Sequence, residues 1–167
     1  RMGSNMVLNL MDKKHQVVVY NRSPDPTTEI AKQGVIPAFS VEEFIQKLPS
    51  PKIIWLMIKS GKSVDDMITS LLPYVKKGNI IIDGGNSYFE DSIRRYNELK
   101  KKGIYFLDCG TSGGMSGARH GACMMVGGDK EVFQKIEVLF KDMCVKDGYG
   151  YMGKSGAGHF VKMVHNG

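Results

Sequence analysis

Short apolar runs alternate with amphipathic segments along the whole chain. Runs rich in aliphatic and β-branched residues are typical of strands buried in a sheet. They occur at 16–20, 52–58, 79–83, 104–108 and 122–126, and the strand at 52–58 is expected to be buried on both faces. A short strand is also expected at 35–36, and 145–153 is either irregular or a strand.

Segments with apolar residues at helical spacing lie between these runs. They predict helices over 2–11, 26–32, 40–48, 63–72, 86–102 and 130–140, and from 155 onward. Ser40 with Glu43 has the pattern of a capping box, and Asn86 or Ser87 is placed to cap the next helix. Strands alternating with helices predict an α/β protein with a doubly wound, Rossmann-like fold: a mostly parallel sheet with helices on both faces.

The chain opens with a helix where a doubly wound fold should open with a strand. In that fold the first strand leads into a Gly-x-Gly-x-x-Gly turn, whose last glycine packs the next helix on the strand, and Gly3 fits that glycine. We therefore expect the first strand to be missing from the sequence, carried by about ten residues before Arg1. Residues 1–154 should form a dinucleotide-binding domain, and 155–167 should begin a helix leading to another domain.

The composition, 42% hydrophobic and 24% charged over 167 residues, is typical of a soluble globular protein. No apolar stretch approaches the ~18 residues of a membrane span, so no membrane partner is expected. Cys109, Cys123 and Cys144 show no Cys-x-x-Cys spacing. This pattern argues against a metal site and favours reduced thiols in the cytoplasm.

The net charge of +6 is compatible with nucleic acid or with small anionic ligands. The lysines at 13–14, 76–77 and 100–102 fall where we expect helices to end, and cations there complement the helix dipole. Aromatic residues, which single-strand binding uses, do not interleave with these lysines. We therefore interpret most of the excess charge as solvated helix ends and expect no nucleic-acid partner.

Asn21, Arg22 and Ser23 end the strand at 16–20. In dinucleotide-binding folds this strand end meets the adenosine ribose, where an acidic residue binds the 2′-hydroxyl of NAD and an arginine can pair with the 2′-phosphate of NADP. No acid is present here, so Arg22 favours NADP, although a surface arginine in a turn would have the same pattern.

Asn86 follows the strand at 79–83 after two glycines. The glycines would let the backbone approach a ligand closely, and the helix start behind Asn86 favours anions. An ordinary N-cap asparagine is the alternative.

Ser112, Gly113 and Gly114 follow the strand at 104–108, in a glycine-rich stretch. Successive backbone N–H groups there can form a nest that binds carboxylate or phosphate. The alternative is a flexible connection with turn glycines.

The last predicted helix has two different faces. We expect its apolar face to pack on the domain; this face comprises Ala157, Phe160, Val161 and Val164. His159, Lys162 and Asn166 lie together on the opposite side. A lysine pointing into a cleft that excludes water can act as a general base, whereas a solvated helix face is the alternative.

Three motifs resemble signatures of the 6-phosphogluconate dehydrogenase family in order and spacing: DGGNSYFEDSIRR, TSGG and GAGHFVKMVHNG. GTSGG looks like the shorter bacterial form of that family. Relatives that act on 3-hydroxyisobutyrate share Ser-Gly-Gly and the helix lysine, but usually lack the His-Asn pair and the Gly-Gly-Asn-Ser motif. The chain therefore resembles the N-terminal cofactor domain of the family.

The resemblance implies a role for each matching residue. Residues that would bind the cofactor are Met2, Gly3, Asn21, Arg22, Ser23, Ile58, Lys59, Ser60 and Asn86. Residues that would bind the substrate are Asn86, Ser112, Gly113, Gly114, Lys162, His165 and Asn166. Lys162 would be the catalytic base and would later stabilise the 3-keto oxygen, while Asn166, with His165, would position and polarise the hydroxyl.

The resemblance also implies oxidative decarboxylation of 6-phosphogluconate to ribulose 5-phosphate in the pentose phosphate pathway, with NADP as cofactor and NAD as the alternative. It implies a cytoplasmic homo-oligomer, a dimer or tetramer. The family's catalytic glutamate and all-helical C-terminal domain are expected beyond Gly167, so residues 1–167 alone should be inactive. Another β-hydroxyacid dehydrogenase, of the 3-hydroxyisobutyrate type, and a non-catalytic dinucleotide-binding module remain as alternatives.

Overall fold

Seven strands form two separate sheets in the computed structural model, which describes residues 1–167. The strands are β1 (Val18–Tyr20), β2 (Ile36–Ala38), β3 (Ile53–Leu56), β4 (Ile80–Asp83), β5 (Tyr105–Ser112), β6 (Ala122–Gly127) and β7 (Cys144–Gly153). β1 pairs with β2 in parallel, and the larger sheet has the order β3-β4-β5-β6-β7. All pairs in the larger sheet are parallel except β5 with β6, which is antiparallel. The predicted Rossmann-like, mostly parallel fold is confirmed.

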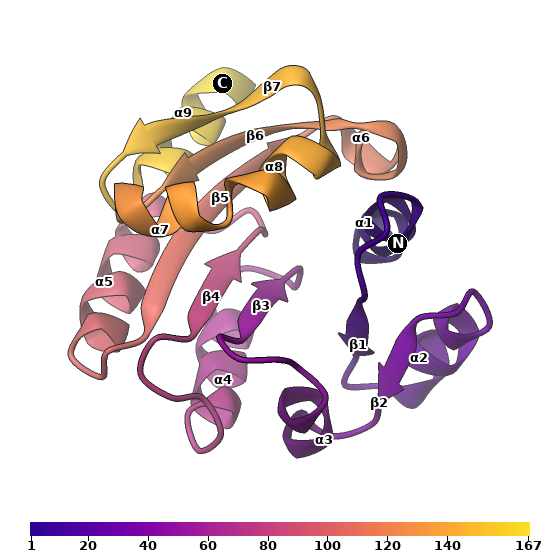
Figure 1. Ribbon diagram of the computed structural model, residues 1–167. Coiled ribbons are helices and arrows are strands. Elements are labelled where there is room, and N and C mark those ends of the chain that lie inside the picture. The colour runs from indigo at the N-terminus through magenta and orange to yellow at the C-terminus, as the bar shows by residue number, and fades with distance from the viewer.

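Nine helices precede, connect and follow the strands and cover both faces of the larger sheet (Figure 1). They are α1 (Met2–Asp12), α2 (Pro24–Ala31), α3 (Val41–Gln46), α4 (Lys62–Leu71), α5 (Phe89–Lys100), α6 (Gly114–His120), α7 (Lys130–Lys135), α8 (Glu137–Met143) and α9 (Ala157–Asn166). In Figure 1 the two-stranded sheet lies on the β3 side of the larger sheet, beside α1 and α2.

Two cores lie on opposite faces of the larger sheet because its strands alternate their side chains. Ile80 and Ile82 of β4 pack with α1, α6, α7 and α8, whereas Ile81 packs with α3, α4 and α5. β5 divides in the same way, with Leu107 on the first face and Phe106 on the second. Asp83 and Asp108, paired in register, therefore point towards the second face.

Some local predictions were wrong. Strand β3 is not buried on both faces, because it is the edge of the larger sheet: Ile53 is exposed and Trp55 is half-buried. Neither Asn86 nor Ser87 caps α5, whose N-cap is Tyr88. The predicted cap of α3 is confirmed, since the Ser40 hydroxyl accepts the Glu43 N–H at 3.1 Å.

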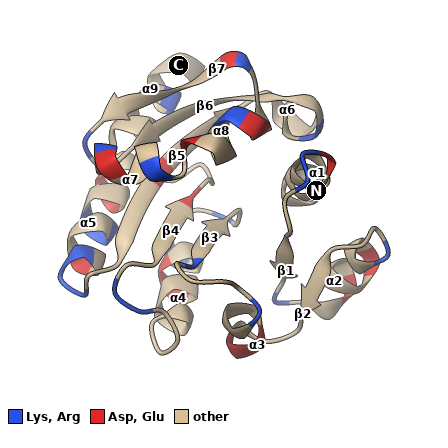
Figure 2. Ribbon diagram, in the orientation of Figure 1, with Lys and Arg blue, Asp and Glu red and all other residues tan.

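The predicted helix over 130–140 is two helices, broken at Ile136 where the backbone has φ −118°. Helix α6 was not predicted, because its sequence is rich in glycine. The lysines at 76–77 lie in the connection after α4, which ends at Leu71, and not at a helix end. Figure 2 shows the basic residues spread over loops and helix ends and also within α5 and α9.

Candidate functional site

The loops that follow β3, β4 and β5 lie at one edge of the larger sheet, which we call the carboxyl edge. The three strands are parallel neighbours, so their ends meet there. Residues 58–60 follow β3, Asn86 follows β4, and Ser112 ends β5. This is the edge at which open α/β sheets bind ligands.

Two glycines after β4 permit this arrangement. A Cβ on Gly85 would lie 2.8 Å from the carbonyl oxygen of Ile58, so the loops after β3 and β4 are in direct contact. A Cβ on Gly84 would lie 2.2 Å from the indole nitrogen of Trp55. The glycines thus bring two strands' loops together, and Asn86 is exposed at their meeting point.

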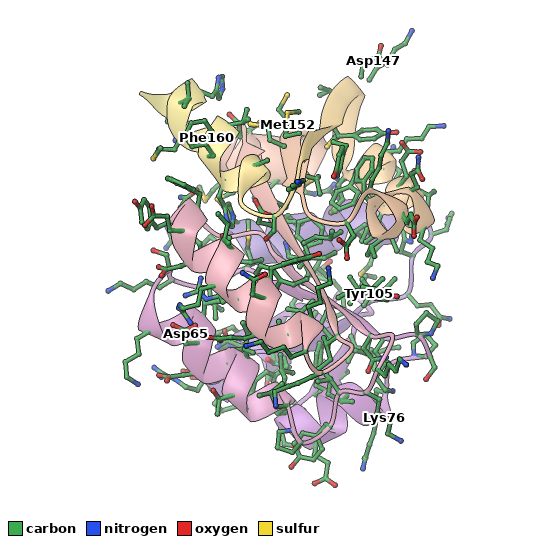
Figure 3. All side chains as sticks on the ribbon, turned by 90° about the vertical axis from the view of Figure 1, so that its left-hand side faces the viewer. Asp65, Lys76, Tyr105, Asp147, Met152 and Phe160 are labelled. Atoms are coloured by element: carbon green, nitrogen blue, oxygen red, sulfur yellow. The ribbon has the colours of Figure 1, made fainter.

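The turn that carries Asn86 is shaped by a buried carboxylate. Asp83 is fully buried and accepts hydrogen bonds from the Ser87 hydroxyl at 2.5 Å and the Gly85 N–H at 3.1 Å. The buried Arg95 of α5 lies 3.8 Å from the same carboxylate. Arg95 also donates to Asp65 of α4, and the guanidinium beside it lowers the pKa of that carboxyl. Figure 3 shows Asp65 where α4 and α5 run side by side.

Helix α9 lies on the face of β5 that carries Asp108. Both Asp108 oxygens accept backbone N–H groups at the start of the helix, from Gly156 at 2.8 Å and from His159 at 2.9 Å. A Cβ on Gly110 would lie 2.3 Å from Lys162 Cβ, so the lysine stem rests on that glycine. The helix therefore places Lys162 against the last residues of β5.

Four of the predicted substrate residues come together here. Lys162 donates to the side-chain oxygen of Asn166 at 2.7 Å, one turn along α9. His165 and Ser112 approach each other at 3.5 Å between the ring Nε2 and the hydroxyl. Lys162 is half-buried and Asn166 is exposed, so both groups can meet a ligand.

The predicted orientation of α9 was wrong. Phe160 and Val164, expected to face the domain, are 45% and 60% exposed, and Met163 is also exposed. The side that packs on the domain carries His159, which is 3% exposed, and the lysine stem. Figure 3 shows Phe160 at the outer surface, and its ring packs edge-on against Phe89 of α5. The reason is that β5 and β6 offer glycines and a carboxylate here, and not an apolar surface.

Gly113 and Gly114 form the turn from β5 into α6. Their φ angles, 123° and 60°, favour glycine, and a Cβ on Gly114 would meet nothing within 4 Å. Both residues are exposed. The turn is thus open to a ligand beside Ser112, as the nest prediction requires.

Helix α1 begins near the carboxyl edge. A Cβ on Gly3 would lie 3.7 Å from Met57 Cβ, just after β3, and Met2 precedes it. Asn5 donates to the backbone carbonyl of Met115 in α6 at 2.9 Å. The positive end of this helix therefore faces the side on which the loops after β3 and β5 lie.

Asn21, Arg22 and Ser23 lie apart from this group, at the end of β1 in the smaller sheet. Asn21 donates to the backbone carbonyl of Ser23 at 2.9 Å and shapes the turn. Arg22 is exposed, and none of the ion pairs of the structure involves it. A free guanidinium beside a free hydroxyl is a donor set that suits a phosphate monoester.

Two hollows of the surface lie elsewhere. One, of about 380 Å³, lies between α4 and α5, and the other, of about 460 Å³, lies beside the start of α7. No cluster of metal-ligating residues is present, and no helix is long and apolar enough to cross a membrane. Neither of these two hollows is lined by a residue of the predicted sites.

Sequence reasoning missed four buried residues that shape the site, Asp83, Ser92, Arg95 and Asp108, and the burial of His159. A signal for the two aspartates exists, since each lies at the end of an apolar run that was predicted as a strand. His159 bonds to Ser92 at 2.7 Å across 67 positions, a pairing that no local pattern reveals.

The fold and this edge define a Rossmann-like NAD(P)-binding domain. A family model described as the NAD binding domain of 6-phosphogluconate dehydrogenase matches residues 1–153. The chain therefore belongs to the 6-phosphogluconate dehydrogenase family, as its N-terminal, cofactor-binding portion.

Named relatives and a solved structure agree with this assignment. A decarboxylating 6-phosphogluconate dehydrogenase of Chlamydia muridarum is 49% identical over 99% of the chain and 36% of its own length. An NAD(+)-dependent decarboxylating enzyme of Bacillus subtilis is 44% identical over 99% of the chain and 37% of its own length. The Plasmodium falciparum 6-phosphogluconate dehydrogenase, solved with NADP+ and with 6-phosphogluconate, superposes with a TM-score of 0.94 and is 37% identical. The match covers 99% of this chain and 38% of the Plasmodium chain.

YqeC of Bacillus subtilis, provisionally named a 6-phosphogluconate dehydrogenase, is 47% identical over 167 residues, all of this chain and 56% of its own length. The alignment with the Chlamydia enzyme spans 175 positions, more than the chain contains, so it includes insertions. The chain thus spans between about a third and just over half of the curated relatives described here.

Proposed function

We propose that the full-length protein containing this chain oxidises and decarboxylates 6-phosphogluconate to ribulose 5-phosphate, with NADP as hydride acceptor, in the pentose phosphate pathway. The observation that carries the proposal is the bonded Lys162–Asn166 pair beside the Ser112–His165 contact, at the carboxyl edge of β5. A domain that only bound dinucleotide would not need a lysine paired in this way.

Lys162 has the geometry of a general base. Its side-chain amine, in the neutral form, takes the proton of the substrate 3-hydroxyl as carbon 3 is oxidised. The cofactor supplies the hydride acceptor when bound. Asn166 accepts a hydrogen bond from Lys162 at 2.7 Å and so orients its amine.

The same lysine serves the second step. Oxidation at carbon 3 gives a β-keto acid, which loses carbon dioxide when the electrons of the breaking carbon–carbon bond move into an enolate. Lys162, now protonated, donates to the oxygen on which negative charge develops and lowers that barrier. An acid that lies outside these residues must then protonate carbon 2.

The remaining substrate residues hold the sugar acid. Ser112 and the N–H groups of Gly113 and Gly114 are placed to bind the carboxylate, with His165 against the Ser112 hydroxyl at 3.5 Å. Asn86, on the neighbouring loop, would contact both substrate and cofactor. These groups lie on β5, α6, α9 and two loops. Because α9 carries Lys162, His165 and Asn166, the geometry of the site depends on how α9 docks on the sheet.

The cofactor residues fit NADP. Arg22 and Ser23 would pair with the 2′-phosphate, Asn21 would shape their turn, and the start of α1 at Met2 and Gly3 would face the pyrophosphate. Residues 58–60 would line the cofactor from the loop after β3. NAD remains the other outcome, because the family includes an NAD(+)-dependent relative.

Two features of the domain fit the proposal that it is part of a larger protein. β1 and β3 belong to different sheets, and we infer that a parallel strand preceding α1 joins them. The exposed apolar face of α9, with Phe160 and Val164, is expected to be covered by a domain that follows. Homo-oligomerisation and a cytoplasmic site of action belong to the same proposal.

The test is cofactor reduction by the full-length protein with 6-phosphogluconate, with carbon dioxide recorded in the same reaction. We expect equal amounts of reduced NADP and carbon dioxide. Lys162→Met should lower the rates of both NADP reduction and carbon dioxide release by a factor of about 10² or more. It should leave NADP binding unchanged. Lys154→Met, an exposed lysine just before α9, is the matched control and should keep full activity.

Other outcomes point to the other functions. Reduction without carbon dioxide would favour a simple hydroxyacid dehydrogenase of the 3-hydroxyisobutyrate type. NADP binding with no turnover of any hydroxyacid would leave a dinucleotide-binding module. Turnover by residues 1–167 alone would contradict the expectation that this portion is inactive.

A further inference from the structure

Helix α9 faces the sheet with polar and glycine contacts and not with its apolar stripe, from which Phe160 packs edge-on against Phe89 of α5 at 5.2 Å between ring centroids. Its most apolar positions, Phe160, Met163 and Val164, are between 45% and 60% exposed. The side facing the sheet carries His159, which is 3% exposed. In a helix that carries proposed catalytic groups, the contacts that do hold it determine where those groups lie.

Asp108 makes the central contact. Its carboxylate is fully buried, and its two oxygens accept the N–H groups of Gly156 and His159 at 2.8 and 2.9 Å. These are first-turn donors that have no partner within the helix. α9 has no side-chain cap of its own, so a strand residue 48 positions away caps it. The positive end of the helix dipole strengthens this contact.

Glycines allow the helix to approach the sheet closely. A Cβ on Gly158 would lie 2.4 Å from the carbonyl oxygen of Met125, and a Cβ on Gly127 would lie 2.7 Å from the N–H nitrogen of Gly158. Neither distance leaves room for a methyl group. The separation between helix and sheet is therefore set by backbone contact.

The contacts along β5 and α9 run in step. Asp108 meets His159, Gly110 meets Lys162, and Ser112 meets His165. Each step is two residues along the strand and three along the helix, and side chains three apart on a helix share a face. A shift of α9 by one residue would move Lys162 off Gly110 and break all three contacts.

A second polar contact fixes the rotation of the helix. His159 Nδ1 and the Ser92 hydroxyl of α5 lie 2.7 Å apart, and both residues are buried. α9 is thus tied to β5 through Asp108 and to α5 through His159.

We propose that Asp108 is a positioning residue: it sets the register of α9 and so places Lys162 and Asn166 over the end of β5. This inference rests on the proposed function for its catalytic consequence, but its structural part stands on the contacts alone. Asp108 does not reach the substrate residues itself, because its carboxylate is buried beneath α9.

The test is Asp108→Asn in the full-length protein, a change that keeps shape but turns one acceptor oxygen into a donor facing an N–H. Hydrogen exchange of the Gly156 and His159 amides should accelerate by about ten- to a hundredfold, the range expected for a lost bond to a charged group. The kcat with 6-phosphogluconate should fall at least about tenfold, whereas the Kd for NADP should stay within about twofold.

A matched control separates positioning from general destabilisation. Val132→Ala removes buried apolar volume in α7, on the opposite face of the sheet. It should lower the melting temperature but leave α9 exchange and kcat unchanged. Should Asp108→Asn fail to fold, Asp108→Glu, which keeps the charge but moves both acceptor oxygens by one methylene, gives the same test. Ser92→Ala tests the second contact separately, with a smaller effect of about fivefold in exchange at His159 and in kcat.

The outcomes distinguish the two proposals. Wild-type exchange at Gly156 and His159 in Asp108→Asn, or an unchanged kcat beside accelerated exchange, would overturn the positioning role. If the unmodified protein does not turn over 6-phosphogluconate, the proposed function fails, and the exchange measurement still decides whether Asp108 holds α9.

Discussion

Lys162 rests on Gly110 so closely that a methyl group on the glycine would lie 2.3 Å from the lysine Cβ and 3.0 Å from the carbonyl oxygen of Gly158. The lysine Cβ is the first atom of its side chain and the carbonyl oxygen belongs to the backbone, so neither atom can swing aside. The contact ties the position of the proposed base to the absence of a side chain on β5.

Gly110→Ala should therefore displace α9. Overpacking of this kind costs about 1–3 kcal/mol in stability, and a shift of about 1 Å in a reacting group costs about a hundredfold in rate. We expect kcat with 6-phosphogluconate to fall by that order, measured by NADP reduction in the full-length protein. Gly150→Ala in β7, whose Cβ would meet only the flexible end of Met152, should keep its activity. Equal losses in both variants would contradict the argument.

Arg22→Ala should weaken NADP binding and spare NAD. A charge-assisted bond to a phosphate contributes about 1.5–3 kcal/mol, so the Kd for NADP should rise by about ten- to a hundredfold. Titration calorimetry or fluorescence with both cofactors gives the comparison. Lys32→Ala, which removes an exposed cation of α2 that pairs with Glu29, is the control. Unchanged NADP affinity in Arg22→Ala would mean that the 2′-phosphate is bound elsewhere.

Asp65 should contribute a pH-dependent part of the stability. Its hydrogen bond with Arg95 lowers its pKa below the ordinary value of 3.8. A carboxyl whose folded pKa is depressed stabilises the fold above its unfolded pKa, and this stabilisation is lost as the pH falls through the folded pKa. The difference in unfolding free energy between the unmodified protein and Asp65→Asn should be constant near neutral pH and should shrink in acid.

Urea unfolding at a series of acidic pH values measures this difference. Asp66→Asn, which breaks the exposed Lys62 pair on the same helix, should change stability little at any pH, because exposed pairs contribute little. A difference for Asp65→Asn that grows in acid would have the wrong sign.

The three cysteines should differ in reactivity. Burial raises the pKa of Cys144 to about 12, and burial also raises the pKa of the fully buried Cys109. Cys123 is exposed. Since the thiolate is the reactive form, alkylation near neutral pH should label Cys123 first and leave Cys109 unmodified until the protein unfolds. Peptide mapping after timed alkylation tests the order, and rapid labelling of Cys109 in the native protein would contradict it.

The strands were predictable because buried parallel strands appear as apolar runs, and β4 is buried throughout. The grouping of Lys162 with Asn166 was also predictable, since one turn of helix separates them. The direction in which α9 faces was not, because a helical pattern reveals which side is apolar but not what the sheet offers in return. Here the sheet offers Gly110, Gly127 and Asp108, so the apolar side faces outward.

Other contacts of the site depend on residues far apart in the sequence. Asp108 meets the start of α9 across 48 positions, and Arg95 meets Asp65 across 30. Glycine-rich segments such as 113–121 look like loops because glycine disfavours helices, yet α6 forms there, with its buried Ala118 in the core.

The reversal of chain direction at β6 has an electrical consequence. Helices α1 and α5 begin near the carboxyl edge, so each presents the partial positive charge of its first turn there. α9 follows β7, which runs against β5, and its contacts progress from Asp108 to Ser112. It therefore runs in the same direction as β5, and its first turn, with partial positive charge, lies at Asp108 and not at this edge. The carboxyl edge thus offers anions the positive ends of α1 and α5, whereas the positive end of α9 is already met by the buried carboxylate of Asp108.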